Sequence, residues 1–198
     1  TLQEIVLDRK TFQPQSIDIN NFPSLKEFPQ PALWSGKLEQ VCYVGGISKI
    51  RGIVELVNAI DQVHPSAQLV LAGGFESEAL RKQVQGLSGW KRVVEKGVLG
   101  RQEVAQVLAQ AKVGLVTLHP TPNYRDALPV KMFEYMAAGI PVIASDFPLW
   151  RDIVESAGCG WCVDPLNTHA IASAIDQAMS NSQIAQEMGQ RGRAMVVT

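Results

Sequence analysis

Residues 41–63 read VCYVGGISKIRGIVELVNAIDQV. An apolar run comes first, two glycines end it, and from residue 50 onward apolar residues recur every three or four positions, the spacing of a helix with one buried face. This order predicts a buried strand at 41–44, a tight glycine turn and an amphipathic helix. A strand that leads directly into a helix is the repeating unit of parallel α/β folds.

The same order recurs along the rest of the chain. Further runs rich in Val, Leu and Ile predict strands at 68–72, 92–95, 113–118, 141–144 and 161–163. Helical patterns lie between them, with Pro129 placed in a first turn, Gly139 as a left-handed C-terminal cap and Asn167 as an N-cap. Repeated units of this kind predict an α/β fold with a doubly wound, mainly parallel, Rossmann-like sheet.

The composition favours a folded domain that binds a small molecule. The chain has 198 residues, of which 46% are hydrophobic, and a formal net charge of -1. No cluster of Lys or Arg suggests a nucleic-acid partner or a basic membrane patch. Three cysteines and the lack of an apolar run of roughly 18 residues lead us to expect a cytoplasmic protein, with contact to the inner face of a membrane only through a missing half.

The first 35 residues differ in composition from the rest. Four prolines, at positions 14, 23, 29 and 31, stand among polar residues and favour extended backbone. We therefore expect residues 1–35 to be an extended arm or inter-domain linker and residues 36–198 to be the ligand-binding domain. Thr1 is not an initiator methionine and the chain stops within a helical pattern, so we expect both ends to be cut.

Ligands of a doubly wound sheet bind beyond the carboxyl ends of its strands. After the first strand comes Gly45-Gly46-Ile47-Ser48-Lys49-Ile50-Arg51-Gly52, where glycines allow close approach and a helix start offers N–H groups to an anion. This composition indicates a phosphate cradle, although glycines that serve only tight packing would look the same. The loop has neither the Gly-Lys-Ser/Thr of a P-loop nor the G-x-G-x-x-G of a dinucleotide site.

Two acidic residues follow the fourth strand. Asp126 lies in the expected loop, and Glu134 lies in the next helix among Met132, Phe133 and Met136. A carboxylate on such an apolar helix is costly without a partner. The partner is either a ligand or, in the structural alternative, an internal cation or helix cap.

Taken together, these motifs resemble the C-terminal, donor-binding domain of retaining glycosyltransferases of the GT-B fold, group 1 or family 4. The resemblance is carried by YVGGISKIRGI (43–53), LVLAGG (69–74), FEYMAAGIPVIASDFP (133–148) and GCGWCVDPLNTHAIASAI (158–175). In that family two acids are separated by seven residues, a spacing that Asp126 and Glu134 keep. The resemblance implies that Glu134 accepts hydrogen bonds from ribose hydroxyls and that Asp126 lies near the donor sugar or phosphate.

The cradle departs from the family pattern at one cation. Gly46 stands where many members have Arg, and Arg51 stands where they have Lys, so Lys131 is a candidate replacement. We expect the base near the ends of the second and third strands, around Gly73, Gly74, Val98 and Leu99. The residues expected to bind the donor are Gly45, Gly46, Ser48, Arg51, Gly73, Leu99, Leu128, Val130, Lys131 and Glu134, and those expected to act in catalysis are Arg51, Lys131 and Asp126.

The resemblance implies transfer of a hexosyl group from a nucleoside diphosphate sugar with retention, in polysaccharide biosynthesis, without a metal or other cofactor. The acceptor would bind to a missing N-terminal half, so this chain alone is expected to be inactive. Two alternatives stay open: a non-catalytic nucleotide-binding or assembly module, and an oxidoreductase using Cys159 and Cys162. His119 either contacts the sugar or has a structural role.

Overall fold

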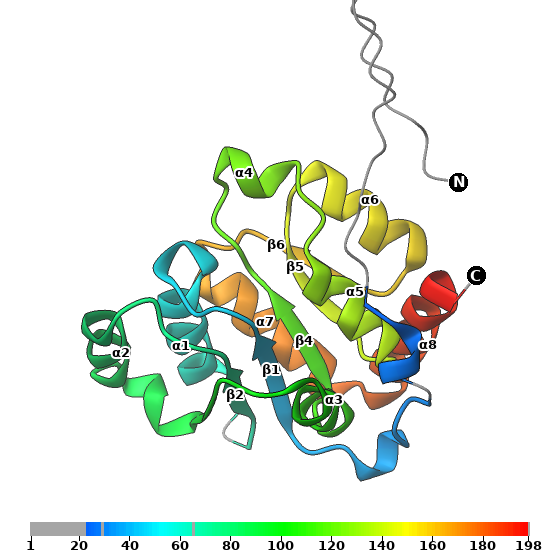
Figure 1. Ribbon diagram of the computed structural model, residues 1–198, viewed down its shortest axis with the longest axis horizontal. Helices are drawn as coiled ribbons and strands as arrows, with labels where there is room; N and C mark the ends of the chain where they lie inside the picture. The colour runs from blue at the N-terminus through cyan, green and yellow to red at the C-terminus, as the bar shows by residue number, and fades with distance from the viewer. Residues whose placement is uncertain (1–22, 29, 65, 198) are drawn as a thin grey trace, which may run out of the picture.

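The computed structural model describes residues 23–28, 30–64 and 66–197. Within these residues, six parallel strands form one sheet in the order β3-β2-β1-β4-β5-β6 (Figure 1). The strands are β1 (Gln40–Val44), β2 (Gln68–Ala72), β3 (Val93–Gly97), β4 (Val113–Val116), β5 (Val142–Ser145) and β6 (Gly160–Val163). Each predicted strand occurs, with its ends moved by at most two residues. The doubly wound, Rossmann-like prediction is confirmed.

Helices connect the strands in sequence order. The α-helices are α1 (Ile53–Gln62), α2 (Glu78–Gln85), α3 (Arg101–Gln110), α4 (Pro122–Arg125), α5 (Val130–Ala137), α6 (Pro148–Ala157), α7 (Thr168–Ser180) and α8 (Ser182–Val197). Short 3-10 helices are η1 (Leu25–Glu27), η2 (Trp34–Gly36), η3 (Lys49–Arg51) and η4 (Ser88–Arg92). Residues 1–22 of the expected arm lie outside the described residues, and η1 and η2 occupy part of its remainder.

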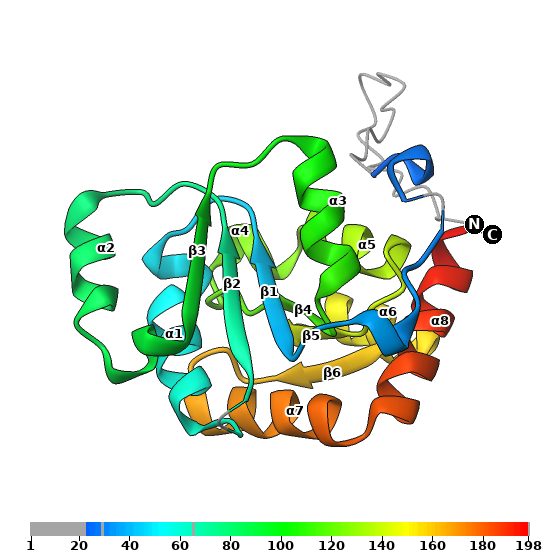
Figure 2. The same ribbon diagram turned by 90° about the horizontal axis from the view of Figure 1, so that it is seen from below.

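The sheet lies between two helical layers (Figure 2). Along β1, Val41 and Tyr43 point into the core shared with α1, α2 and α7, whereas Cys42 and Val44 point into the core shared with α3, α5 and α6. Strands buried on both faces explain why the sequence shows continuous apolar runs instead of alternation. Helix α8 packs against α5 and α6 on the second side.

Local signals set the helix ends. Asn167 is the N-cap of α7, and its side chain accepts from the N–H groups of His169 and Ala170. Gly139 follows α5 with a φ of 71°, so its left-handed conformation is confirmed. Pro129 caps α5 from the position before its first turn, which corrects the expectation that it lies within that turn.

Strand order reverses between β1 and β4, which makes their carboxyl ends the topological switch point of the sheet. Tyr135 of α5 is inserted there. Its hydroxyl accepts from the Val44 N–H at 3.0 Å and donates to the Leu115 carbonyl at 3.3 Å. A Cβ on Gly114 would lie 2.2 Å from the Tyr135 ring, so only glycine leaves room for it. Helix α5 is thereby held at a fixed depth beside the switch point.

Candidate functional site

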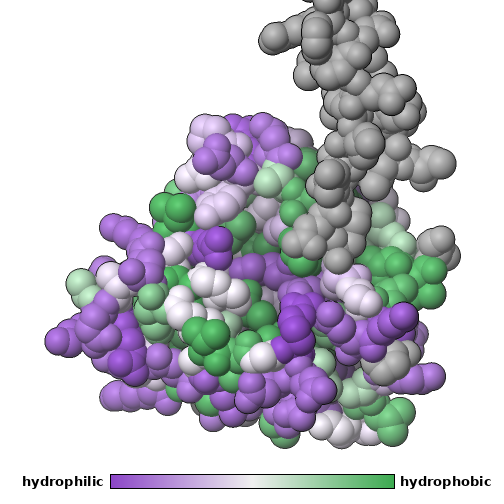
Figure 3. All heavy atoms as spheres, in the orientation of Figure 1, coloured by the Kyte–Doolittle hydropathy of each residue, from purple (hydrophilic) through white to green (hydrophobic). Residues whose placement is uncertain are grey.

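A cavity of about 570 Å³ opens at the switch point. This volume is ordinary for a small-molecule site. The face shown in Figure 3, which carries α3 and α5 in front of the sheet, has hydrophilic and hydrophobic side chains side by side. The cavity is lined by Val44, Gly45, Gly46, Arg51, Ala72, Gly73, Gly74, Val98, Leu99, Arg101, Val104, Leu118, Tyr124, Ala127, Leu128, Pro129, Val130, Lys131, Glu134 and Trp150.

Most of the residues predicted from the sequence meet in this cavity. Those that line it are Gly45, Gly46, Arg51, Gly73, Leu99, Leu128, Val130, Lys131 and Glu134. Two others do not. Ser48 precedes η3 with its hydroxyl buried, and Asp126 is exposed at the end of α4. The structure therefore does not bring Asp126 to the cavity, although its spacing from Glu134 matches the family.

Close backbone contacts build the cradle. A Cβ on Gly73 would lie 1.9 Å from the Gly45 carbonyl oxygen, so the turns after β1 and β2 touch through glycine alone. Gly45 has a φ of 115°, which favours glycine there as well. Arg51 folds back over the turn and donates to the Gly46 carbonyl at 3.2 Å and to the Tyr124 hydroxyl at 3.3 Å. A Cβ on Gly46 would lie 2.9 Å from Arg51 Nη1, so Arg51 occupies the space beside Gly46.

Lys131 is the least satisfied group of the cavity. Its Nζ is buried, lies 3.7 Å from the centre of the Tyr43 ring and has no hydrogen-bond partner among the described residues. Burial, reinforced by the charge of Arg51, lowers the pKa of Lys131 to about 7. The ring attracts the ammonium but accepts no conventional hydrogen bond. An anion held at Gly45 and Gly46 would supply the missing acceptor.

Glu134 has an internal partner. Its residue is only 5% exposed, and its Oε1 accepts from Arg101 Nη1 at 2.7 Å. Arg101 also donates to Glu27 of η1, at 2.9 Å from Nε. The hydrogen bond to Glu27 is the largest cause, and the hydrogen bond to Glu134 the second, of a pKa of Arg101 above its ordinary value. The internal cation of the structural alternative is therefore present as Arg101, and contact of Glu134 with a ligand stays a prediction.

Sequence reasoning did not identify three of the side chains that line the cavity: Arg101, Tyr124 and Trp150. Trp150 of α6 is fully buried, and its Nε1 donates to the Ala127 carbonyl at 2.7 Å, which supports the loop before α5. The signal that was available for Arg101 is its place at the start of the helix after β3. Helix starts after parallel strands face the ligand edge of this fold.

The remaining candidates lie elsewhere. His119 Nε2 is 3.1 Å from Glu55 Oε2 in α1, and His119 does not line the cavity, so its surroundings favour the structural role. Cys159 and Cys162 are free thiols. Burial raises the pKa of Cys159 to about 11, and burial together with the Asp146 carboxylate raises the pKa of Cys162 to about 12. Thiols that stay protonated are poor nucleophiles, which argues against the oxidoreductase alternative.

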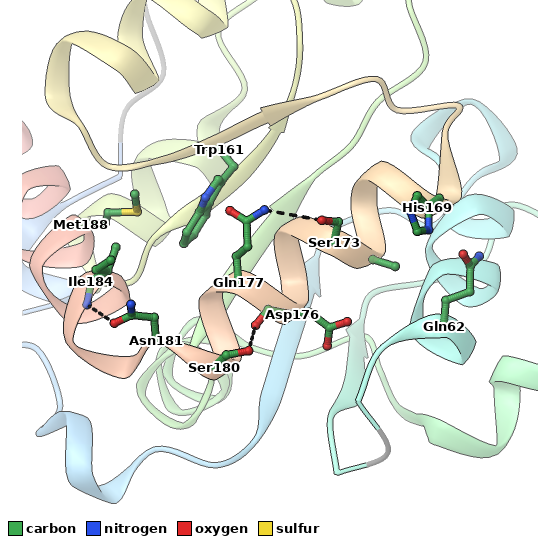
Figure 4. Close-up of a pocket in the computed structure, with 11 residues that line it drawn as sticks. Gln62, Trp161, His169, Ser173, Asp176, Gln177, Ser180, Asn181, Ile184 and Met188 are labelled. Carbon is green, nitrogen blue, oxygen red and sulfur yellow. Dashed lines mark hydrogen bonds between the residues drawn. The ribbon is translucent and has the colours of Figure 1, made fainter.

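A second pocket, of about 660 Å³, lies along α7 and the start of α8, on the face of the sheet that α1 and α7 cover (Figure 4). Trp161 of β6, Gln177 and Met188 border it. It contains none of the predicted site residues and does not lie at the carboxyl ends of the strands. The predicted residues that meet in space do so in the cavity at the switch point.

The described residues show neither a metal cluster nor a membrane span. No three His, Cys, Asp or Glu side chains in this part of the chain are grouped as metal ligands. No helix formed by these residues is long and apolar enough to cross a bilayer. Independence from metal stays a prediction.

Curated proteins with similar sequences include a sugar-phosphate synthase and a mannosyltransferase. The chain is 27% identical to an alpha-maltose-1-phosphate synthase of Mycolicibacterium smegmatis over 170 residues, covering 77% of this chain and 42% of that protein. It is 28% identical to a phosphatidyl-myo-inositol mannosyltransferase of Mycobacterium leprae over 165 residues, covering 81% of this chain and 42% of that protein. The chain thus spans less than half the length of these relatives.

Solved structures share the fold. A sucrose-phosphate synthase from Thermosynechococcus elongatus superposes with a TM-score of 0.75 and 28% identity, covering 89% of this chain and 46% of that one. Anabaena HepE in complex with UDP-glucose gives a TM-score of 0.75 at 19% identity, and the match covers 90% of this chain and 51% of that one. The latter identity supports the fold alone.

A family match covers most of the chain. The sequence profile described as glycosyl transferases group 1 matches residues 25–195. That range includes the whole sheet, the cradle after β1 and the helix that carries Lys131 and Glu134. The chain belongs to the group 1 glycosyl transferases.

Proposed function

We propose that this chain is the donor-binding domain of a glycosyltransferase and holds a nucleoside diphosphate sugar in the cavity at the switch point. One observation carries the proposal. Lys131 and Glu134, three positions apart on α5, line one cavity, and the cradle glycines Gly45 and Gly46 line it too. A cation without an acceptor and a carboxylate are the groups that a diphosphate and a ribose require.

The diphosphate binds at the cradle end in this proposal. Arg51 and Lys131 supply positive charge, and each interaction is worth roughly 4 kcal/mol gross at about 4 Å and an effective dielectric near 20. The helix N-terminus adds only about 0.3 to 2 kcal/mol. The two side-chain cations therefore dominate the affinity for the diphosphate. Leu128 and Val130 offer backbone N–H groups, whereas Pro129 between them has none.

The ribose and base extend toward β2 and β3. Glu134 accepts from ribose hydroxyls, and Gly73, Gly74, Val98 and Leu99 lie where the base would rest. Backbone groups of these glycines and of the loop after β3 can read the edge of a base. Because the structurally similar HepE was solved in complex with UDP-glucose, UDP is the first nucleotide to test.

The same cations serve the reaction. As the bond from the anomeric carbon to the diphosphate breaks, negative charge grows on the leaving oxygen, and Arg51 and Lys131 stabilise that charge in this proposal. This role requires no divalent metal. In the proposal, transfer proceeds with retention, and the acceptor is bound by a second domain that faces this cavity. Asp126 is exposed outside the cavity and has no role in the proposed reaction.

Calorimetry of the 198-residue chain with UDP, GDP and ADP tests the proposal. We expect at least one nucleotide to bind, with the same affinity when a chelator is present. No heat and no chemical-shift change with any of the three at millimolar concentration would exclude a nucleoside diphosphate site.

A further inference from the structure

We propose that Arg101 is a positioning residue: it holds the Glu134 carboxylate toward the ribose, and Glu27 holds Arg101 in turn. The inference rests on the function proposed above and deepens it. It assigns a role to η1, a segment that precedes the sheet, in a site otherwise built from strand ends. Arg101 itself makes no contact with the reacting atoms in this proposal.

The geometry of the three side chains forms a chain of charge-assisted hydrogen bonds. Arg101 Nη1 donates to Glu134 Oε1 at 2.7 Å, and Nε donates to Glu27 Oε2 at 2.9 Å. Nη2 donates to the same Glu27 oxygen in a still shorter contact. All three nitrogens of the guanidinium are therefore used. Arg101 is the first residue of α3, so its backbone is fixed by the helix that follows β3.

The arrangement leaves one oxygen of Glu134 for a ligand. Within the described residues, hydrogen bonds reach only Oε1, from Arg101, and none reaches Oε2. A carboxylate has about four acceptor positions, so one bond to Arg101 does not exhaust it. Because Glu134 lines the cavity, Oε2 is available to a hydroxyl group there.

Arg101 also keeps Glu134 away from Lys131. The two groups lie one helical turn apart on α5, and the charge of Glu134 raises the pKa of Lys131 against the effect of burial. Without Arg101, the carboxylate would be drawn to the unpartnered Lys131 ammonium. Such a pair would remove the acceptor from the ribose and the cation from the diphosphate at once.

Glu27 is itself anchored. The neighbouring Phe28 is 5% exposed and belongs to the core between the sheet and α3. Its carbonyl accepts from Arg193 of α8 at 2.8 Å. The Arg101 side chain is 54% exposed and would otherwise be free to choose among many rotamers. Its three hydrogen bonds to two fixed carboxylates select one.

The test uses calorimetry to compare the affinities of the 198-residue chain for UDP, 2′-deoxy-UDP and pyrophosphate. GDP and ADP are measured in parallel, each with its 2′-deoxy form. A charge-assisted hydrogen bond to the hydroxyl gives the unmodified chain a preference for UDP over 2′-deoxy-UDP of roughly 10- to 150-fold. Arg101→Gln should reduce this ratio toward one and should also weaken the binding of pyrophosphate, because the released Glu134 carboxylate pairs with Lys131. Glu27→Gln should give an intermediate ratio.

Two further variants separate positioning from folding. Arg101→Lys should restore part of the preference, because one ammonium can hold one carboxylate oxygen but lacks the planar fork of arginine. Arg81→Gln is the matched control: Arg81 is 39% exposed, pairs with Glu95 and lies outside the cavity. It should leave every affinity as it is.

An Arg101→Gln chain that keeps the full preference for the ribose hydroxyl would overturn the inference. Tighter UDP binding by that variant would also overturn it, since Arg101 would then obstruct the ribose. If the unmodified chain binds none of UDP, GDP and ADP, the proposed function fails first, and this inference fails with it. The two failures are therefore distinguishable.

Discussion

Replacing Lys131 with methionine should weaken diphosphate binding and stabilise the fold at the same time. Methionine keeps most of the volume and all of the apolar stem of the side chain but removes the ammonium. In the present structure that ammonium is buried against Tyr43, finds no acceptor among the described residues, and has its pKa lowered to about 7. The group is costly to the empty domain and valuable only when an anion is bound.

The effect on binding follows from two opposing terms. Attraction between one ammonium and one phosphate charge is roughly 4 kcal/mol at about 4 Å and an effective dielectric near 20. At pH 8, one unit above a pKa of about 7, recharging Lys131 costs about 1.4 kcal/mol. The difference, about 2 to 3 kcal/mol, predicts a roughly 30- to 160-fold higher Kd for UDP in Lys131→Met. At pH 6 no recharging is needed, so the ratio of the two Kd values should grow about tenfold.

The effect on stability has the opposite sign. Because the folded pKa of Lys131 is lowered, the unfolded chain binds more protons between about pH 7 and 10.5, and stability rises with pH through that window. Below pH 7 the full cost of the buried charge is present. Lys131→Met removes it and should raise the free energy of unfolding at pH 7 by several kcal/mol, on the order of 3 to 5. The variant should also lose that part of the pH dependence.

Calorimetry with UDP at pH 6 and pH 8, and urea unfolding at pH 7 and pH 9, measure the two effects. Lys82→Met is the control, because Lys82 is exposed on α2 and lies outside the cavity. Equal UDP affinity of Lys131→Met and the unmodified chain at both pH values would refute the assignment of Lys131 to the diphosphate. A variant less stable than the unmodified chain at pH 7 would refute the account of its burial.

Four other substitutions have defined outcomes. Glu134→Ala should weaken the binding of UDP far more than the binding of pyrophosphate, and Arg51→Ala should have the opposite ranking. Calorimetry with both ligands checks this ranking, and equal losses of affinity would contradict the assigned contacts. Tyr135→Phe leaves the buried Val44 N–H without its acceptor and should lower the free energy of unfolding by about 1 to 3 kcal/mol in urea titration, with little change in UDP affinity if the backbone stays in place. Gly52→Ala places a Cβ on backbone with a φ of 80° and 2.2 Å from the Thr117 carbonyl oxygen. It should therefore lower the free energy of unfolding by more than the roughly 1 to 2 kcal/mol typical of left-handed backbone. The clash should also displace the cradle, so stability and pyrophosphate binding should be lost together.

The sheet and most of the cavity could be predicted because their signals are local. Apolar runs and helical spacing locate strands and helices, and the winding rule of parallel sheets then brings the loops after β1, β2, β3 and β4 to one edge. Glu134 follows from the same reasoning, and Lys131 follows from the family resemblance; both lie in the first turns of α5. No distant contact is needed to place them.

The pairing of side chains could not be predicted in this way. Arg101 reaches Glu134 across 33 positions of sequence and Glu27 across 74, and no period or motif connects these residues. Asp126 shows the reverse case. Its spacing from Glu134 satisfies the family pattern, but α4 ends at Arg125 and leaves the Asp126 side chain exposed. A spacing fixes the position of a residue along the chain and does not determine where its side chain points.

The insertion of Tyr135 beside Gly114 has a consequence for how donor preference can change in this family. Because the tyrosine bonds both β1 and β4, the helix that carries Lys131 and Glu134 is locked to the two central strands and cannot shift without breaking them. The two groups on this helix that are proposed to bind phosphate and ribose are therefore held in place by the centre of the sheet. We expect changes in base or sugar preference to fall in the segments at 98–100 and 119–128, which lie outside the central strands and leave Arg101 in place.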